Sequence, residues 1–156
     1  MWCLPAMTGD PPSRVEAELY TGPLPEGLEP PRLVVTPPAS QGPGEGVDDL
    51  IILEVRGLPP DVQPLPLSAA QPAGVLKVVG HPTDKPPWMV ASFSVLKATE
   101  RQVVLDGQLK PGASGSPVVN DNGQVLGLIY ETSTYDKQDI NFVFAYRTAA
   151  IQSRLP

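Results

Sequence analysis

One serine stands in a setting that could make it reactive. Ser114 lies in the glycine-rich stretch LKPGASGSPVVN, residues 109–120, directly before an apolar run. A bend of this kind exposes a hydroxyl while neighbouring backbone N–H groups converge on one point, which suits the stabilisation of an oxyanion during acyl transfer. The donors would be the N–H groups of Gly112 and Ser114, since glycine presents its N–H without an obstructing Cβ. Ordinary turns have the same composition, so spacing alone leaves both interpretations open.

Short strands must position this bend. The apolar residues alternate with period two or form short runs bounded by glycine, proline, asparagine and aspartate, which is typical of strands. The pattern predicts strands at residues 14–20, 32–36, 49–55, 74–80, 89–97, 102–106, 116–120, 124–130 and 140–146. Asn122-Gly123 lies between two apolar runs and predicts a hairpin. The one predicted helix covers residues 148–155, with Thr148 as a possible cap. We therefore expect a mostly β fold with a short C-terminal helix.

A proline-rich stretch divides the predicted strands into two groups. Proline removes a backbone donor and is excluded from central strands, so residues 57–72 predict a linker. We expect a partial N-terminal barrel with proline-rich loops over residues 1–56, and a C-terminal barrel with the Ser114 bend and the helix over residues 73–156. Three strands are too few to close a barrel, so the first barrel is expected to be incomplete.

The stretch PGASGSPVVNDNGQVLG, residues 111–127, resembles the nucleophile segment of trypsin-like serine peptidases of the HtrA and glutamyl-endopeptidase kind. Segments similar to the same family occur in the same order at residues 47–55, 75–82 and 142–146, so the resemblance covers about two-thirds of the chain. It implies a chymotrypsin-like double β-barrel with Ser114 as the nucleophile. It also implies Asp49, or Asp48 beside it, as the triad aspartate, and the N–H groups of Gly112 and Ser114 as the oxyanion hole.

The resemblance also suggests which residues contact a substrate. Gln108 and Leu109, before the nucleophile, would help to line the pocket for the substrate side chain next to the scissile bond. Tyr130 and Glu131, at the end of the strand after the hairpin, would form an edge for an extended peptide. No carboxylate occurs in residues 108–111, which argues against a preference for lysine or arginine. The expected partner is a peptide or protein substrate, and neither a metal nor an organic cofactor is implied.

The family mechanism needs a histidine as general base, in a segment before the aspartate. His81 is the only histidine in the sequence, and it follows Asp49 in a Gly-x-Pro bend that the resemblance places in a loop of the second barrel. Two explanations remain open. Either the histidine and the missing strands lie upstream in a longer protein, or the chain is an inactive pseudopeptidase that binds peptides or proteins. One truncation would explain both absences, so we favour a serine endopeptidase domain that has little or no activity as this chain alone.

The composition argues against several other classes. Apolar residues make up 41% and charged residues 18%, as in folded globular proteins. With a net charge of −6 and no two basic residues in succession, the chain is not expected to bind nucleic acid. No signal peptide and no membrane segment of about 18 apolar residues is visible, so we expect this chain to be soluble, in a compartment that the sequence does not reveal. The oligomeric state is likewise unknown.

Two other kinds of site are also excluded. Cys3 is the only cysteine, so neither an internal disulfide nor a cysteine-based zinc cluster can form. An α/β-hydrolase elbow has the pattern G-x-S-x-G on a strand-to-helix turn. Here Ser116 takes the place of the second glycine, and a predicted strand follows.

Overall fold

The computed structural model describes residues 15–18, 32–35, 60–80, 89–135 and 140–152, and its contacts divide the chain into two units, residues 1–63 and 64–156. In the first unit, β1 (Val15–Glu18) and β2 (Arg32–Val35) form an antiparallel pair. The predicted strand at residues 49–55 lies outside the described residues. The boundaries of the partial barrel and the linker therefore stay predictions.

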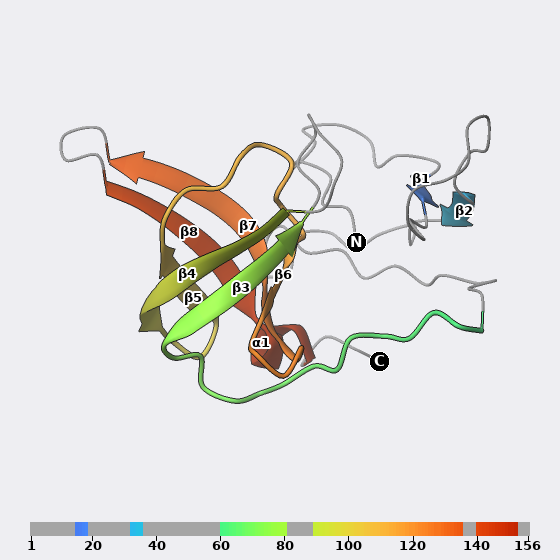
Figure 1. The fold of residues 1–156 in the computed structure, drawn as a ribbon, viewed down its shortest axis with the longest axis horizontal. Coiled ribbons are helices and arrows are strands. Elements are labelled where there is room, and N and C mark those ends of the chain that lie inside the picture. The colour runs from blue at the N-terminus through green and yellow to red at the C-terminus, as the bar shows by residue number, and fades with distance from the viewer. Residues whose placement is uncertain (1–14, 19–31, 36–59, 81–88, 136–139, 153–156) are drawn as a thin grey trace. The chain divides into compact units, whose positions relative to one another are not determined.

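The second unit is a closed barrel of six strands. Its members are β3 (Val75–Gly80), β4 (Met89–Ala98), β5 (Gln102–Asp106), β6 (Pro117–Val119), β7 (Val125–Tyr135) and β8 (Ile140–Arg147). Around the barrel the order is β3-β4-β5-β8-β7-β6, and every neighbouring pair is antiparallel. β7 and β8 run side by side and extend beyond the other strands (Figure 1). The prediction of a mostly β fold is confirmed.

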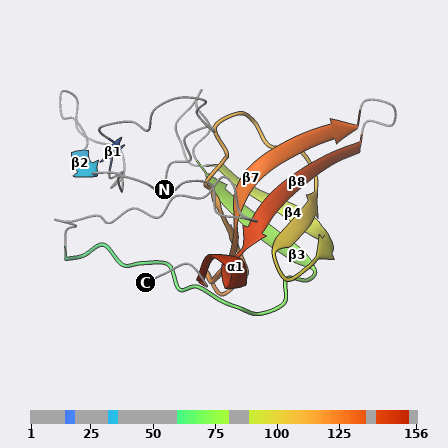
Figure 2. The ribbon, with the colours of Figure 1, turned by 180° about the vertical axis from the view of Figure 1, so that it is seen from behind.

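A short helix ends the described part of the chain. α1 (Thr148–Gln152) follows β8 directly (Figure 2). The hydroxyl of Thr148 donates a hydrogen bond to the carbonyl of Val125, at 2.9 Å, so this buried side chain ties the start of α1 to β7. None of the helices in the described ranges is long and apolar enough to cross a membrane.

The strand bounds follow the sequence pattern except in β7. β5 has the predicted bounds, and the other barrel strands begin and end within two residues of them. β7 continues five residues past the predicted end at residue 130. The polar residues of this extension pair with β8, from Glu131 opposite Phe144 to Tyr135 opposite Ile140. Cross-strand pairing therefore extends a strand that the alternation of apolar residues does not predict.

The barrel closes through few residue pairs. β3 pairs with β4 through six residue pairs but with β6 through only two, Lys77 with Val119 and Val78 with Val118. Just beyond β6, the ammonium of Lys77 lies 2.8 Å from Asp121 Oδ1, in an exposed ion pair. We call this contact between β3 and β6 the closing seam.

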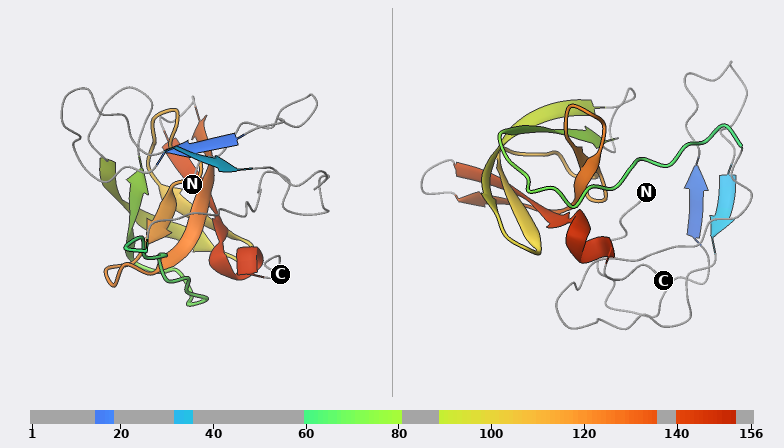
Figure 3. Two further views of the ribbon diagram at one scale, coloured as in Figure 1. Left: turned by 90° about the vertical axis from the view of Figure 1, so that its right-hand side faces the viewer. Right: turned by 90° about the horizontal axis from the view of Figure 1, so that it is seen from below.

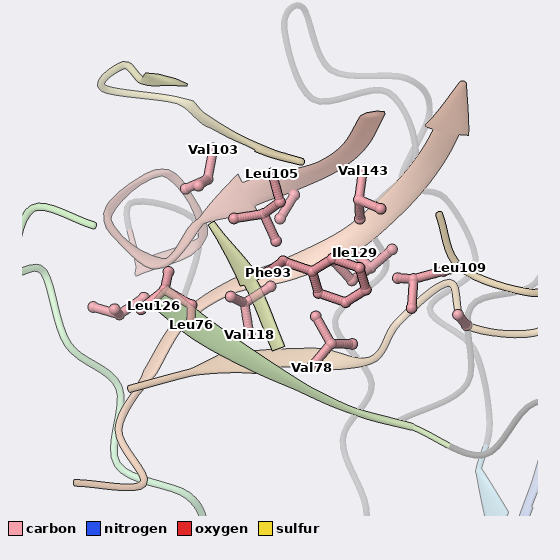
Figure 4. Close-up of a cluster of buried hydrophobic side chains, with 12 residues drawn as sticks. Leu76, Val78, Phe93, Val103, Leu105, Leu109, Val118, Leu126, Ile129 and Val143 are labelled. Atoms are coloured by element: carbon pink, nitrogen blue, oxygen red, sulfur yellow. The ribbon is translucent and has the colours of Figure 1, made fainter. Parts of the chain in front are cut away.

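The barrel interior is an apolar core to which every strand contributes. Figure 3 gives two further views of the strands that enclose it. Leu105, Val78, Val103, Val118 and Val143 have no exposed surface, and Ile129 is nearly as buried. Leu109, from the segment before Ser114, points into the same cluster as Phe93 and Ile129 (Figure 4). The core thus reaches from the strands into the bend that carries the serine.

The segment that leads into the barrel is fastened to it. The N–H of Ser68 donates to the carbonyl of Val125, and the N–H of Val125 donates to the carbonyl of Pro66, at 2.9 and 2.8 Å. The buried guanidinium of Arg147 donates to the carbonyls of Ala69, Ala70 and Thr99. Residues 66–70 are therefore held against the barrel by backbone and side-chain hydrogen bonds.

Candidate active site

The Ser114 bend is a compact backbone turn with an exposed tip. The N–H of Ala113 donates to the carbonyl of Lys110 at 3.2 Å, and the N–H of Ser116 donates to the carbonyl of Ala113 at 3.0 Å. Gly112 and Gly115 have φ angles of 91° and 83°, a region that favours glycine. Ala113 is buried and Ser114 is exposed. The sequence therefore anchors the bend by its small apolar residue and leaves the serine hydroxyl at the surface.

Strand β7 fixes the backbone of the two residues that follow the serine. The N–H of Gly115 donates to the carbonyl of Ile129 at 2.7 Å, and the N–H of Ile129 donates to the carbonyl of Ser116 at 3.0 Å. Both bonds involve a single residue of β7, and the side chain of Ile129 is buried in the core. The backbone that follows Ser114 is therefore attached to a rigid point of the barrel.

Two backbone donors of the bend are not used internally. Within the described residues, the N–H groups of Gly112 and Ser114 make no hydrogen bond to the protein. Both residues are exposed, so these donors are accessible to a ligand. These are the two N–H groups that the sequence predicts for an oxyanion hole, and two available N–H groups beside a hydroxyl are what a tetrahedral oxyanion requires.

Close packing from β3 confines the bend on its other side. A Cβ built on Gly80 would lie 2.4 Å from the Oγ of Ser116 and 3.3 Å from its Cβ. Glycine at the end of β3 thus lets the bend approach this strand. The sequence signal is the Gly-x-Pro stretch at residues 80–82, of which only Gly80 lies in the described residues.

The four predicted substrate-contacting residues have different surroundings. Gln108 and Glu131 are exposed, Tyr130 is half-buried, and Leu109 is buried in the core with 6% of its surface exposed. Gln108 and Glu131 thus offer side chains at the surface, whereas Leu109 offers its side chain to the interior. Their roles toward a substrate stay predictions.

The β7 extension offers a backbone edge close to the bend. β6 pairs with β7 no further than Leu128, and from Glu131 onward the described residues provide a partner on one side only, from β8. An extended peptide can add as a strand to an unpaired edge of this kind. This edge begins two residues after Ile129, to which the Ser114 bend is attached.

Tyr130 belongs to an aromatic cluster that the sequence analysis did not single out. Its ring stacks on Tyr146, with centroids 4.2 Å apart and planes inclined by 19°, and it lies 6.2 Å from Phe144. Gln102 donates a side-chain hydrogen bond to the hydroxyl of Tyr130. Burial raises the pKa of Tyr130, the bond from Gln102 opposes this, and the nearby carboxylate of Glu131 adds to it. Tyr130 is therefore a neutral phenol at ordinary pH.

The predicted base and acid lie outside the described residues. Asp49, its alternative Asp48, and His81 all fall in segments that the structure does not describe. Their predicted relation to Ser114 thus stays a prediction. Within the described ranges, no group of three histidine, cysteine, aspartate or glutamate side chains is placed to hold a metal ion.

Sequence reasoning found the bend but missed the contacts of Tyr130. The contacts of Gln102 and Tyr146 with Tyr130 join residues 28 and 16 positions apart, and single-sequence periodicity carries no signal for such pairs. The available signal was the alternation of Phe142, Phe144 and Tyr146 along β8, which places three aromatic rings on one face of the strand.

The comparisons with known proteins agree with this architecture. The structure is similar to the protease Rv3671c from M. tuberculosis H37Rv in its inactive form, with a TM-score of 0.59, 20% identity, and coverage of 92% of this chain and 78% of that chain. A mutant of the same protein with serine replaced by alanine gives a TM-score of 0.60 at 19% identity, covering 92% of this chain and 75% of that one. The likeness shows the fold, that of the chymotrypsin-like proteases. No curated protein matches the sequence.

The family model for the trypsin-like peptidase domain matches residues 15–128. This range is well over half of the chain, and it includes the first strand pair, the predicted linker, the Ser114 bend and the beginning of β7. The chain therefore belongs to the family of trypsin-like serine peptidases.

Proposed function

We propose that this chain is the nucleophile-bearing domain of a serine endopeptidase, which cleaves peptide bonds through an acyl-enzyme on Ser114. The observation that carries the proposal is the bend itself. Ser114 is exposed, its own N–H and that of Gly112 make no internal hydrogen bond in the described residues, and the backbone that follows it is fastened to a buried residue of β7.

The bend can serve each step of acyl transfer. The Oγ of Ser114 attacks the substrate carbonyl carbon, and its proton passes to a general base. The negative charge that develops on the carbonyl oxygen is stabilised by the N–H groups of Gly112 and Ser114. Collapse of the tetrahedral intermediate breaks the C–N bond, and the amine leaves with the proton from the base. Water then attacks the ester in the same way and releases Ser114.

The general base would be a histidine outside these 156 residues. His81 follows Asp49 in the chain, and the resemblance places it in a loop of the second barrel. Asp49, with Asp48 as its alternative, would orient the base histidine and stabilise its protonated form. The proposed reaction needs neither a metal nor an organic cofactor.

The substrate would bind as an extended strand. Among the described residues, β7 has a partner on one side only from Glu131 onward. This edge supports the mode, because backbone hydrogen bonds would hold a peptide next to the bend whatever its side chains. Gln108 would contact the side chain beside the scissile bond from the exposed start of the bend. Peptides and proteins are therefore the proposed substrates.

Labelling with a fluorophosphonate tests the nucleophile. The protein encoded by the complete reading frame and the 156-residue chain are each treated with the probe, and the modified peptide is identified by mass spectrometry. We expect modification of Ser114 in the complete protein, its loss in Ser114→Ala, and little labelling of the 156-residue chain. Ser116→Ala is the matched control, because this buried serine lies two residues away, and it should keep labelling within about threefold. Labelling that persists in Ser114→Ala would contradict the assignment of Ser114 as the nucleophile.

A second candidate is a pseudopeptidase that binds peptides without cleaving them. The sequence observation that favours it is the lack of any histidine before Asp49. If the complete protein resists the probe but binds extended peptides, and a proline introduced at Thr132 in the β7 edge removes that binding, the binding function replaces the catalytic one. Efficient cleavage by the 156-residue chain that disappears in His81→Ala would overturn both accounts of the histidine.

A further inference from the structure

The position of the Ser114 bend depends on one backbone residue of β7. Ile129 accepts a hydrogen bond from Gly115, the residue after the serine, and donates one to Ser116. A displacement of Ile129 along or across the barrel would therefore move the serine and the adjacent N–H groups with it. A misplacement of about 1 Å can lower a reaction rate about a hundredfold.

The strand is irregular at the very next residue. β7 pairs regularly with β8 up to Ile129 opposite Ala145, and the register then shifts, so that Glu131 lies opposite Phe144. Tyr130 is the extra residue at this shift. A bulge interrupts the ladder and leaves the extra residue without a cross-strand partner, so regular pairing does not hold Tyr130 in place.

The side chain of Tyr130 makes the contacts that the ladder lacks. Its ring stacks on Tyr146 of β8, and its hydroxyl accepts a hydrogen bond from Gln102 of β5. Gln102 and Tyr146 are themselves direct cross-strand partners. Tyr130 is thus held by contacts with the neighbouring strands β5 and β8. It directly follows Ile129, the residue to which the bend is attached.

We propose that Tyr130, held by Gln102 and Tyr146, is a positioning residue that fixes the Ser114 bend through the backbone of Ile129. This inference rests on the proposed nucleophile and goes beyond it. It assigns Tyr130 a role other than substrate contact. As a half-buried neutral phenol, Tyr130 acts through packing and one hydrogen bond and not through proton transfer.

The test separates maximal rate from binding. A fluorophosphonate that carries a short peptide is reacted with the protein encoded by the complete reading frame. The reaction gives a maximal rate constant of labelling and a half-saturation concentration of the probe. We expect Tyr130→Leu to lower the maximal rate constant about tenfold or more and to leave the half-saturation concentration unchanged. Tyr130→Phe keeps the stacked ring and should retain the rate within about threefold, which is the rescue by a conservative variant.

Two further variants sharpen the result. Gln102→Met breaks the same hydrogen bond as Tyr130→Phe, so the double variant should lose no more than either single variant. Phe142→Leu is the matched control. It removes an aromatic ring from the same face of β8, 6.3 Å from Phe144. Within the described residues this ring makes no ring contact with Tyr130, so the labelling rate should stay within about twofold.

Contrary outcomes are distinct. A raised half-saturation concentration at an unchanged maximal rate would make Tyr130 a substrate contact, and an equal loss in Phe142→Leu would reduce its role to general stability. If even the unaltered protein is not labelled, the proposed nucleophile fails, and the amide resonance of Gly115 in NMR spectra decides the positioning role. A shift of that resonance in Tyr130→Leu but not in Phe142→Leu supports the role, and its absence overturns it.

Discussion

Two turns flank β6, and they use their polar groups in opposite ways. In the turn after β6, residues 120–124, backbone and side-chain polar groups form hydrogen bonds with one another. The side chain of Asn120 accepts hydrogen bonds from the N–H groups of Asn122 and Gln124 and donates one to the Gln124 side chain, each at 3.0 Å. The Ser114 bend before β6 contains two glycines with positive φ, yet in the described residues it leaves the N–H groups of Gly112 and Ser114 without a partner.

The difference separates a turn that serves the fold from one that can serve a ligand. Both turns have exposed residues, and both need glycine, with φ of 73° at Gly123 and 91° at Gly112. A self-bonded turn contributes its polar groups to stability. A turn with available donors gives up that contribution and keeps the donors for an incoming group. Substitutions in the two turns should therefore change different quantities.

The largest difference is expected at the two glycines. Gly112→Ala places a side chain at positive φ and reorients a proposed oxyanion donor, so we expect the rate of fluorophosphonate labelling to fall about a hundredfold. Gly123→Ala meets the same backbone strain with no atom within 4 Å of the new Cβ, and it should leave the rate unchanged. Labelling rates of the two variants, with thermal unfolding as a check on folding, measure the contrast. Similar labelling rates in Gly112→Ala and Gly123→Ala would contradict the proposed difference between the two turns.

A second variant disturbs the Ser114 bend from outside. Gly80→Ala forces a Cβ against Ser116 and should destabilise the protein by about 1–3 kcal/mol, with a slower labelling rate because the bend shifts. Removal of the opposing hydroxyl in Ser116→Ala relieves the shorter of the two contacts. The double variant should therefore recover part of both losses in urea unfolding and labelling. Strict additivity of the two substitutions would show that the contact does not position the bend.

The self-bonded turn should respond in stability alone. Asn120→Ala removes three side-chain hydrogen bonds and should cost about 1–2 kcal/mol of unfolding free energy. The labelling rate should stay the same, since the bonds of this turn do not reach the Ser114 bend. Urea unfolding and labelling of the same preparation distinguish these effects. A loss of rate beyond the loss of folded protein would mean that the two turns are coupled across β6.

The smallest effect is expected from the ion pair beside the same turn. The hydrogen bond from Lys77, together with its charge, holds the pKa of Asp121 below its ordinary range. A lowered folded-state pKa gives a contribution to stability that is present above the unfolded pKa of about 4 and disappears as the pH falls through the folded pKa. Melting temperatures of the unaltered protein and Asp121→Asn should differ slightly at about pH 6 and converge toward about pH 2.5. A constant difference over this range would exclude the ion pair as its cause.

Much of the barrel could be predicted because its strands alternate apolar and polar residues around Gly-rich turns. The bounds of β5 and the hairpin around Asn122-Gly123 follow from such local signals, although the connection runs from residue 120 to 124 and is longer than a two-residue turn. The extension of β7 and the contacts of Tyr130 could not be predicted. They arise from cross-strand partners on β8 and β5, and a sequence pattern read along one strand contains no information about the neighbouring one. The possible Thr148 cap likewise bonds outside its helix, to Val125.

The site was predictable where one short segment carries it. Gly112, Ala113 and Ser114 are consecutive, so their types and spacing define the bend without knowledge of the fold. The residues that hold the bend, Gly80 and Ile129, come from two other strands and become neighbours only when the barrel forms.

The closing seam should give the labelling of Ser114, the proposed nucleophile, a temperature dependence of its own. Only two residue pairs join β3 to β6, and β6 continues directly from the Ser114 bend. Proteins open locally where few residue pairs join neighbouring elements, at free energies below that of global unfolding. Warming should therefore separate β3 from β6 while the rest of the barrel is still folded. The Ser114 bend would then lose its fixed conformation. The loss of fluorophosphonate labelling at Ser114 is then expected to precede melting, and cooling should restore the labelling without refolding of the chain.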